Sequence, residues 1–164
     1  MNLHEPTATP EMCLKELGLR LPQQPPAPIG AFCNVRIAGG LAFVSGQGPV
    51  SESGDLRIGK VGHTVTTGEA CGDARLVALN ILAALRGHLG SLDKVSGVVK
   101  LTGMVNATPE FADHPEIIDA ASNLIAGVFG QQGVHARTSY GVASLPNQIT
   151  VEIDAIFELV QDGK

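Results

Sequence analysis

Short apolar segments, separated by glycine, proline or polar turns, predict most of the strands. Residues 31–38 (AFCNVRIA) and 41–47 (LAFVSGQ) are apolar and β-branched on either side of Gly39-Gly40. Because glycine readily adopts the positive φ angles of tight hairpin turns, this pattern predicts an antiparallel pair of strands. Residues 94–106 predict a third strand, and residues 135–159 predict two more around the turn Leu145-Pro146-Asn147.

Two longer segments carry apolar residues at helical spacing. Residues 66–90 begin with Thr66 and Glu69 at the spacing of a capping box and close at Gly90. One face of this helix would consist of Ala70, Ala74, Val77, Ile81, Ala84 and Leu85. Residues 114–130 predict a second helix, which begins after Asp113 with Pro115 in its first turn. The order β-β-α-β-α-β-β predicts an α+β fold, with two helices packed on one face of a sheet.

The beginning of the chain differs from the rest. Residues 10–21 (PEMCLKELGLRL) mix leucines with charges after Pro10, which predicts a short helix. Residues 22–30 (PQQPPAPIG) interrupt regular structure, because each proline removes a backbone donor and restrains the residue before it. We therefore divide the chain into an N-terminal helix and Pro-rich arm at residues 1–24 and one domain at residues 25–164.

Composition and charge narrow the class of protein. The chain has 164 residues, 44% of them hydrophobic, which is enough for one core. Its net charge is -5 and it has no run of Lys or Arg, so we expect neither nucleic acid nor an anionic membrane as a partner. The N-terminus lacks the basic start and apolar core of a secretory signal, and no apolar run approaches the ~20 residues of a membrane span. We therefore expect a cytoplasmic protein.

Common catalytic and metal-binding motifs do not fit the chain. The three cysteines and five histidines lack metal-ligand spacing, so we expect small buried thiols and no metal. Ser45 lacks the first glycine of a nucleophile elbow. Ser91 to Lys94 matches S-x-x-K, but it follows a predicted helix end and is more typical of a capped surface turn.

Arg137 and Glu152 stand in the middles of the last two predicted strands. A charge withdrawn from water is costly unless it is paired or binds a ligand. In the last strand one face would carry Val151, Ile153, Ala155, Phe157 and Leu159, and the other Glu152, Asp154, Ile156 and Glu158. The first face suits the helices. The second suits a subunit contact that leaves a wet cleft.

The same region resembles a known family. Residues 136–159 (ARTSYGVASLPNQITVEIDAIFEL) resemble the signature of the Rid (reactive intermediate deaminase) family, also called YjgF-like or L-PSP endoribonuclease, which runs A-R-S-x-x-x-V-x-x-L-P and then V-E-I-E-A-I. The stretches PPAPIGAFCNV and LAFVSGQGPV resemble its earlier P-x-x-x-G-P-Y and S-G-Q segments. The resemblance implies a chorismate mutase-like fold with a mixed β-sheet, assembled as a homotrimer with clefts between subunits. It also implies hydrolysis of reactive 2-enamine or 2-imine acids to 2-keto acids with release of ammonia, without a metal or organic cofactor.

The resemblance also implies roles for residues. Arg137 would hold the carboxylate of a small ligand through a two-pronged contact, which a guanidinium matches and an ammonium does not. Glu152 would orient, or help to activate, the attacking water. The cleft would further be lined by Ser45, Gly46, Phe32 and Ser139.

The chain departs from the family at several of these positions. Phe32 stands where the best-characterised members have a tyrosine, Ser139 stands where many deaminases have a cysteine, and the N-terminal helix and arm exceed the compact family pattern. The missing tyrosine hydroxyl suits an alternative, a non-catalytic trimer that binds small carboxylate metabolites. A third possibility, the endoribonuclease or translation inhibitor of the older family name, is disfavoured by the acidic balance.

A purely structural role for Arg137 also stays open. It could pair across strands with Glu152 or Asp154. An arginine beside Glu152 would lower the pKa of that carboxyl, which favours orientation of water over general-base catalysis.

Overall fold

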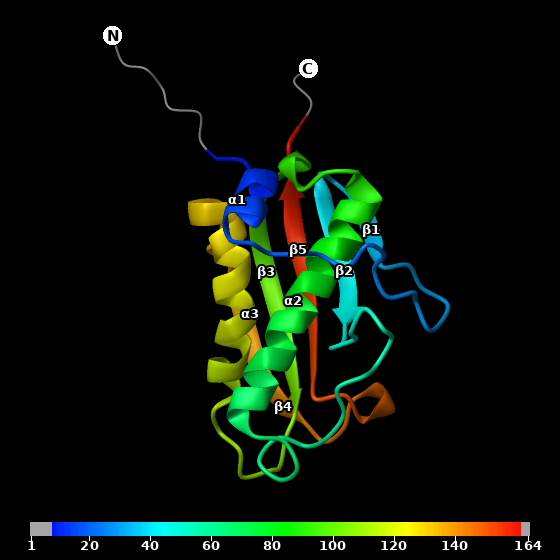
Figure 1. The fold of residues 1–164 in the computed structure, drawn as a ribbon, viewed down its shortest axis with the longest axis vertical. Helices are drawn as coiled ribbons and strands as arrows, with labels where there is room; N and C mark the ends of the chain where they lie inside the picture. Colours follow the sequence, from blue (N-terminus) through cyan, green and yellow to red (C-terminus); the bar gives the residue numbers. More distant parts are fainter. Residues whose placement is uncertain (1–7, 162–164) are drawn as a thin grey trace.

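The computed structural model describes residues 8–161 as a five-stranded sheet with helices on one face (Figure 1). The strands are β1 (Val35–Ala38), β2 (Leu41–Gln47), β3 (Val95–Asn106), β4 (Ala136–Val142) and β5 (Val151–Leu159). Their order in the sheet is β1-β2-β5-β3-β4, and β3 and β4 run parallel while the other pairs are antiparallel. The predicted α+β class with a mixed sheet is therefore confirmed.

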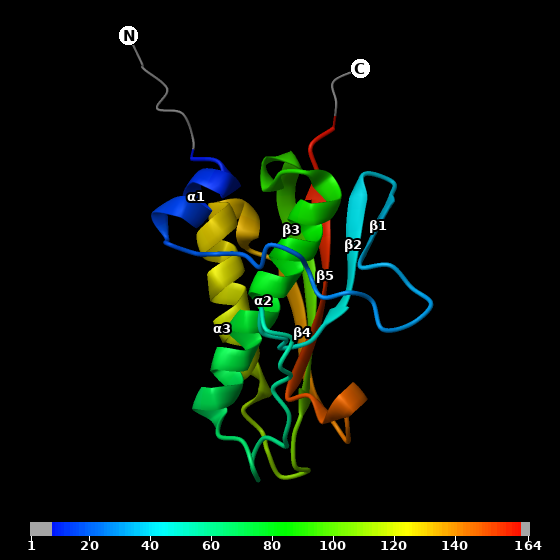
Figure 2. The same cartoon turned by 45° about the vertical axis from the view of Figure 1, so that its right-hand side comes forward.

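The helices are α1 (Pro10–Glu16), α2 (Thr67–Leu89) and α3 (His114–Phe129). The capping box of Thr66 and Glu69 forms at the start of α2, and Gly90 ends the helix in the left-handed conformation, with φ 86°. Figure 2 shows α2 and α3 together on one side of the sheet, with α1 beside the end of α3. The helix predicted over residues 10–21 is confirmed but shorter, since the chain turns at Gly18 with φ 64°.

The core lies between the sheet and the helices. Along β5, Val151, Ile153, Ala155 and Phe157 are buried, whereas Glu152, Asp154 and Ile156 are half-buried on the open face. The alternation predicted for this strand is confirmed. Predicted turns also form as expected: Gly39 and Gly40 link β1 to β2 with φ 57° and 79°, and Ser91 caps a 3-10 turn at Leu92–Lys94.

The last two strands are not partners in the sheet, because β3 lies between them. Arg137 pairs in register with Leu101, a buried residue of the helix-covered face, whereas Glu152 pairs with Met104 on the open face. The two charges therefore lie on opposite faces of the sheet. The alternative left open above, an ion pair of Arg137 with Glu152 or Asp154, is wrong, because β3 separates the two strands and Arg137 pairs with Asp119.

The thiols differ from expectation. Cys33 is exposed in the loop before β1, and Cys13 and Cys71 are only half-buried, so the prediction of buried thiols is wrong. All three are free. Across residues 8–161, every helix is too short or too polar to span a membrane.

Candidate functional site

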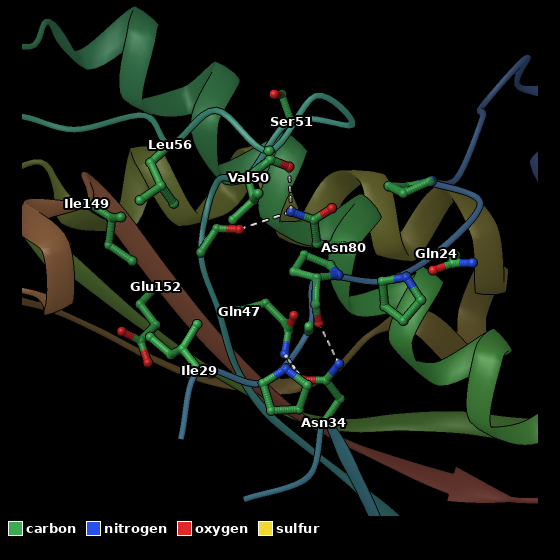
Figure 3. Close-up of a pocket in the computed structure, with 18 of the residues that line it drawn as sticks. Gln24, Ile29, Asn34, Gln47, Val50, Ser51, Leu56, Asn80, Ile149 and Glu152 are labelled. Atoms are coloured by element: carbon green, nitrogen blue, oxygen red, sulfur yellow. Dashed lines mark hydrogen bonds between the residues drawn. The ribbon is translucent and has the colours of Figure 1, made fainter. Parts of the chain in front are cut away.

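A pocket of about 1000 Å³ lies at the end of β2, between the Pro-rich arm (residues 22–29) and the loop formed by residues 48–56 (Figure 3). Phe32, Gly46 and Glu152, from the predicted site, are among its lining residues. The sequence placed these residues in different segments, and the fold brings them together.

Side-chain amides fix the wall of the pocket that the arm forms. Nδ2 of Asn34 donates to the backbone oxygen of Pro26 at 2.7 Å. Nε2 of the buried Gln47 donates to Oδ1 of Asn34 at 3.4 Å and to the backbone oxygen of Ser45 at 3.1 Å. The arm is thus tied through Asn34 to the end of β2.

A buried amide on α2 fixes the opposite wall. Nδ2 of Asn80 donates to the backbone oxygens of Gly48 and Val50, each at 3.0 Å. Figure 3 shows Asn80 and Glu152 on opposite sides of the pocket. Sequence reasoning missed Asn80, although a signal was present: it follows Val77 by three positions and precedes Ala84 by four, which places an amide on the apolar stripe of the helix.

Glu152 is a half-buried carboxylate whose environment favours its neutral form. Burial raises the pKa of Glu152, and the negative charge of Asp154 raises this pKa further. The predicted lowering of its pKa by a neighbouring arginine is wrong, because Arg137 lies on the other face of the sheet. A carboxyl with a raised pKa can take up and return a proton closer to neutral pH than an ordinary glutamate can.

Gly46 allows Glu152 to occupy this position. The register between β2 and β5 shifts between Val44 and Gln47, which places Gly46 directly against the Glu152 side chain. A Cβ atom at residue 46 would overlap the carboxylate. Irregularities of this kind in a strand often re-aim side chains beside functional sites.

Ser45 lies next to the pocket, but its hydroxyl is occupied. Its Oγ donates to the backbone oxygen of Cys33 at 2.7 Å, which ties β2 to the loop that carries Phe32. Phe32 itself is 48% exposed and presents an apolar ring to the pocket. In this chain Ser45 thus supports the wall of the pocket.

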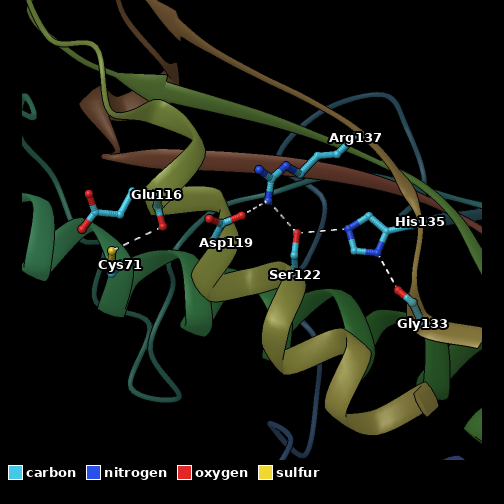
Figure 4. A network of polar contacts seen from close by, with 7 residues as sticks. All are labelled: Cys71, Glu116, Asp119, Ser122, Gly133, His135 and Arg137. Atoms are coloured by element: carbon cyan, nitrogen blue, oxygen red, sulfur yellow. Dashed lines mark hydrogen bonds and ion pairs between the residues drawn. The ribbon is translucent and has the colours of Figure 1, made fainter. Parts of the chain in front are cut away.

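Arg137 belongs to a polar network between β4 and α3 (Figure 4). Its Nη1 donates to Oδ1 of Asp119 at 2.6 Å and to Oγ of Ser122 at 3.1 Å. Nη1 takes both acceptors, and no residue within 8–161 hydrogen-bonds to Nε or Nη2. The edge of the guanidinium formed by Nε and Nη2, which can donate two parallel hydrogen bonds to a carboxylate, therefore stays available.

His135 continues this network. Its Nδ1 lies 2.6 Å from the backbone oxygen of Gly133, and its Nε2 lies 3.0 Å from Oγ of Ser122. Because a carbonyl only accepts, Nδ1 donates the hydrogen bond to Gly133. In that tautomer Nε2 accepts a hydrogen bond from the Ser122 hydroxyl. Ser122 Oγ then accepts from Arg137. Sequence reasoning missed Asp119, Ser122 and His135, since the contact between α3 and β4 depends on the tertiary fold.

Ser139 lies on the same strand as Arg137, two positions further along. Its Oγ is buried and has no hydrogen-bond partner among the described residues. The hydroxyl therefore does not face solvent in the single chain. Arg137 and Ser139 are absent from the lining of the pocket that holds Phe32, Gly46 and Glu152, so the predicted site residues form two separate groups.

Comparison with known proteins identifies the class to which this fold and site belong. The sequence profile of the YjgF/chorismate mutase-like endoribonuclease family matches residues 11–157, and the chain belongs to this family. Protein TCP17 of Trypanosoma cruzi is 39% identical over 147 residues, which cover 89% of this chain and 91% of that protein. The family resemblance predicted from the sequence is confirmed.

Solved structures agree with this assignment. The protein Atu1372 of Agrobacterium tumefaciens, described as having unknown function, has a TM-score of 0.81 and 44% identity, with 92% of each chain covered. E. coli TdcF, crystallised with bound serine, has a TM-score of 0.61 and 24% identity, with 84% of this chain and 95% of that chain covered. The second likeness concerns the fold alone.

Proposed function

We propose that the protein hydrolyses reactive 2-enamine and 2-imine acids to 2-keto acids and ammonia, as a homotrimer with its clefts between chains. The observation that carries the proposal is the placement of Arg137 and Glu152 on opposite faces of one sheet. One chain cannot apply both groups to a small ligand. A cleft between neighbouring chains can, if Glu152 comes from one chain and Arg137 from the next.

Arg137 holds the carboxylate of the substrate in this proposal. Asp119 and Ser122 fix Nη1 of its guanidinium, and the free Nε and Nη2 are the two donors that a bidentate carboxylate contact needs. The carboxylate is thereby anchored, and the adjacent C2 carbon is held at a fixed distance. Because the reacting groups are held together, binding energy offsets part of the entropy that a bimolecular reaction would lose in its transition state.

Glu152 serves the attacking water. The iminium form of the substrate has an electrophilic C2 carbon, to which the water oxygen bonds while one water proton passes to the Glu152 carboxylate. Return of this proton to nitrogen allows the C–N bond of the resulting carbinolamine to break. The electron pair of that bond leaves on ammonia, the hydroxyl oxygen forms the C=O bond, and the hydroxyl proton passes to the departing ammonia. The products are a 2-keto acid and ammonium. The raised pKa of Glu152 supports this role, since the carboxyl can hold the proton between the two steps.

A second candidate is a trimer that binds small carboxylate metabolites without turnover. Phe32 supports it, because the ring in the pocket offers no hydroxyl to bond a substrate or water. The serine bound to TdcF, a protein of the same fold, is a small carboxylate of the kind either candidate would take. The two candidates differ in turnover and not in binding.

The test uses imines generated in place by an amino-acid oxidase, with semicarbazide trapping what survives. We expect wild-type protein to lower the trapped fraction, and Arg137→Ala and Glu152→Ala to lose this effect separately. Mixing the two variants by unfolding and joint refolding should restore about a quarter of the wild-type activity. This follows because a quarter of randomly formed clefts pair an intact Glu152 with an intact Arg137.

The outcomes separate the candidates. Recovery in the mixture would establish a hydrolase whose site spans two chains. Turnover by wild type with no recovery would place both residues in one chain's site and refute the shared cleft. Binding of 2-oxobutyrate by a folded trimer, without acceleration for any imine, would favour the binding protein.

A further inference from the structure

We propose that the Pro-rich arm builds a side-chain subsite in the pocket, which accepts substrates with long uncharged side chains and rejects acidic ones. The inference rests on the proposed function and specifies its substrate class. It also gives the N-terminal helix a role, because that helix anchors the arm.

The arm is held just before its first residue and again at Pro26. At its beginning, Leu14 and Leu21 are buried, and Oε1 of Glu11 accepts from the backbone nitrogen of Leu92 at 3.0 Å. Within the arm, Asn34 holds the backbone oxygen of Pro26. A proline-rich segment fixed at these points is a stiff wall with little conformational entropy to lose when a ligand binds.

Aliphatic side chains stand on both sides of the pocket, among polar ones. Ile29 of the arm is 77% exposed, and Leu56 of the opposite loop is 39% exposed. Ile149 adds a third aliphatic side chain. Figure 3 shows these three side chains around the pocket together with Glu152. An extended hydrocarbon chain that leaves the reacting C2 carbon beside Glu152 would run between these walls.

The charge of the pocket selects against acidic ligands. Glu52 and Glu152 are the charged residues among the described residues that line it, and no Lys, Arg or His accompanies them. A carboxylate at the far end of a substrate would meet this negative field in a partly desolvated space without a cation to pair with it. The substrate's own 2-carboxylate is held elsewhere, by Arg137 of the neighbouring chain in the proposed cleft.

The volume of the pocket also favours substrates with long side chains. At about 1000 Å³ it stands at the upper end of the range of about 300 to 1000 Å³ typical of sites for drug-sized ligands. A three-carbon imine acid would leave most of it filled with water. Each further methylene that the walls bury should raise kcat/KM about fourfold, from the usual transfer free energy of a methylene.

The experiment compares imines made from alanine, 2-aminobutyrate, norvaline, norleucine and glutamate. We expect kcat/KM to rise along the unbranched series and to fall for the glutamate imine below that for norvaline, which has a similar length. Ile29→Trp and Leu56→Trp narrow the pocket from opposite walls. Each should lower kcat/KM for the norleucine imine by about tenfold or more relative to kcat/KM for the alanine imine.

A matched control is Val160→Trp. Val160 is a 54% exposed aliphatic residue that is not part of the pocket lining, and this variant should keep the wild-type profile. Circular dichroism and melting temperatures show whether each variant folds. If no imine is hydrolysed, the same series of 2-oxo acids is tested for binding by calorimetry.

Each result bears on the subsite. A rise with chain length that the two pocket variants abolish would support it, whether in turnover or in binding alone. Equal kcat/KM for short and long side chains, with Ile29→Trp unchanged, would overturn it while the proposed hydrolysis stands. Absence of both turnover and 2-oxo acid binding would overturn the subsite together with the proposed function.

Discussion

The network behind Arg137 offers a direct test of how the carboxylate contact is built. Asp119 and Ser122 both accept from Nη1, which leaves Nε and Nη2 directed for a ligand. We predict that the double variant Asp119→Ala, Ser122→Ala binds 2-oxobutyrate more weakly than wild type, because the free guanidinium must then lose its rotational freedom on binding. In the proposed site these are positioning residues, since they contact Arg137 and not the carboxylate.

The size of the expected loss in affinity follows from how far the two contacts of Arg137 are exposed to solvent. The side chain of Asp119 is 57% exposed and that of Arg137 is 22% exposed, so their ion pair contributes about 0 to 1 kcal/mol. The bond from the charged Nη1 to Ser122 is only half-buried and contributes about 1 kcal/mol, the central value for hydrogen bonds in proteins. Together, about 1 to 2 kcal/mol corresponds to a loss of about 5- to 30-fold in affinity.

The assay is calorimetric titration with 2-oxobutyrate, alongside KM and kcat for its imine. We expect KM to rise with kcat little changed, and the melting temperature to move only slightly. Glu116→Gln is the matched control, because it removes a charge from the same exposed helix without touching Arg137. A Kd within about twofold of wild type in the double variant would refute the reasoning, since an unheld arginine should cost more than that. Tighter binding would show that Asp119 competes with the ligand.

Further predictions concern the pocket and the sheet. Gly46→Ala should displace the Glu152 carboxylate rather than unfold the strand, because the overlapped atoms are the flexible end of a side chain; we expect kcat to fall with a nearly unchanged melting temperature. Because burial raises the pKa of Glu152, the folded chain holds this proton more tightly than the unfolded chain, and the free energy of unfolding falls as pH rises above the ordinary value of 4.5. Glu152→Gln should therefore raise the melting temperature at pH 7 but not below pH 4.5, and equal shifts at both pH values would contradict this. Gly103→Ala would place a Cβ atom 2.5 Å from side-chain carbons of Ile118, so urea unfolding should show a loss of about 1 to 3 kcal/mol; the control Gly72→Ala, with open space around its Cβ, should not destabilise.

Local pattern was sufficient for the elements of the fold. The Gly39-Gly40 turn, the capping box at Thr66 and the alternation along β5 depend on neighbours within a few residues, and each formed as predicted. The order of the strands in the sheet could not be predicted from such local patterns. The turn at Leu145 suggested that β4 and β5 would meet, but β3 pairs with both, and that choice depends on burying Leu101 beneath the helices.

The site divides in a similar way. Glu152 and Arg137 stood out because charges interrupt apolar strands, and the family signature named both. Asn80 and Asn34 were missed because they hold backbone atoms of segments about 30 and 8 residues away, which have no sequence pattern of their own. The partner of Arg137 was also missed, since Asp119 lies on the exposed surface of α3 and resembles any solvated acid.

The fold stabilises its two strand charges by different means. Arg137 is paired, with Asp119 and Ser122 accepting from one nitrogen, so its guanidinium is oriented while Nε and Nη2 are open among the described residues. Glu152 has no cation beside it within residues 8–161, and burial instead shifts its equilibrium toward the protonated form. These are the opposite requirements of a permanent carboxylate anchor and of a group that must gain and lose a proton. Were the two side chains on one face, each would neutralise the other, lowering the pKa of Glu152 and occupying the fork of Arg137. In the proposed shared cleft, their separation within the chain would preserve both chemistries until a neighbouring copy brings them to the same ligand.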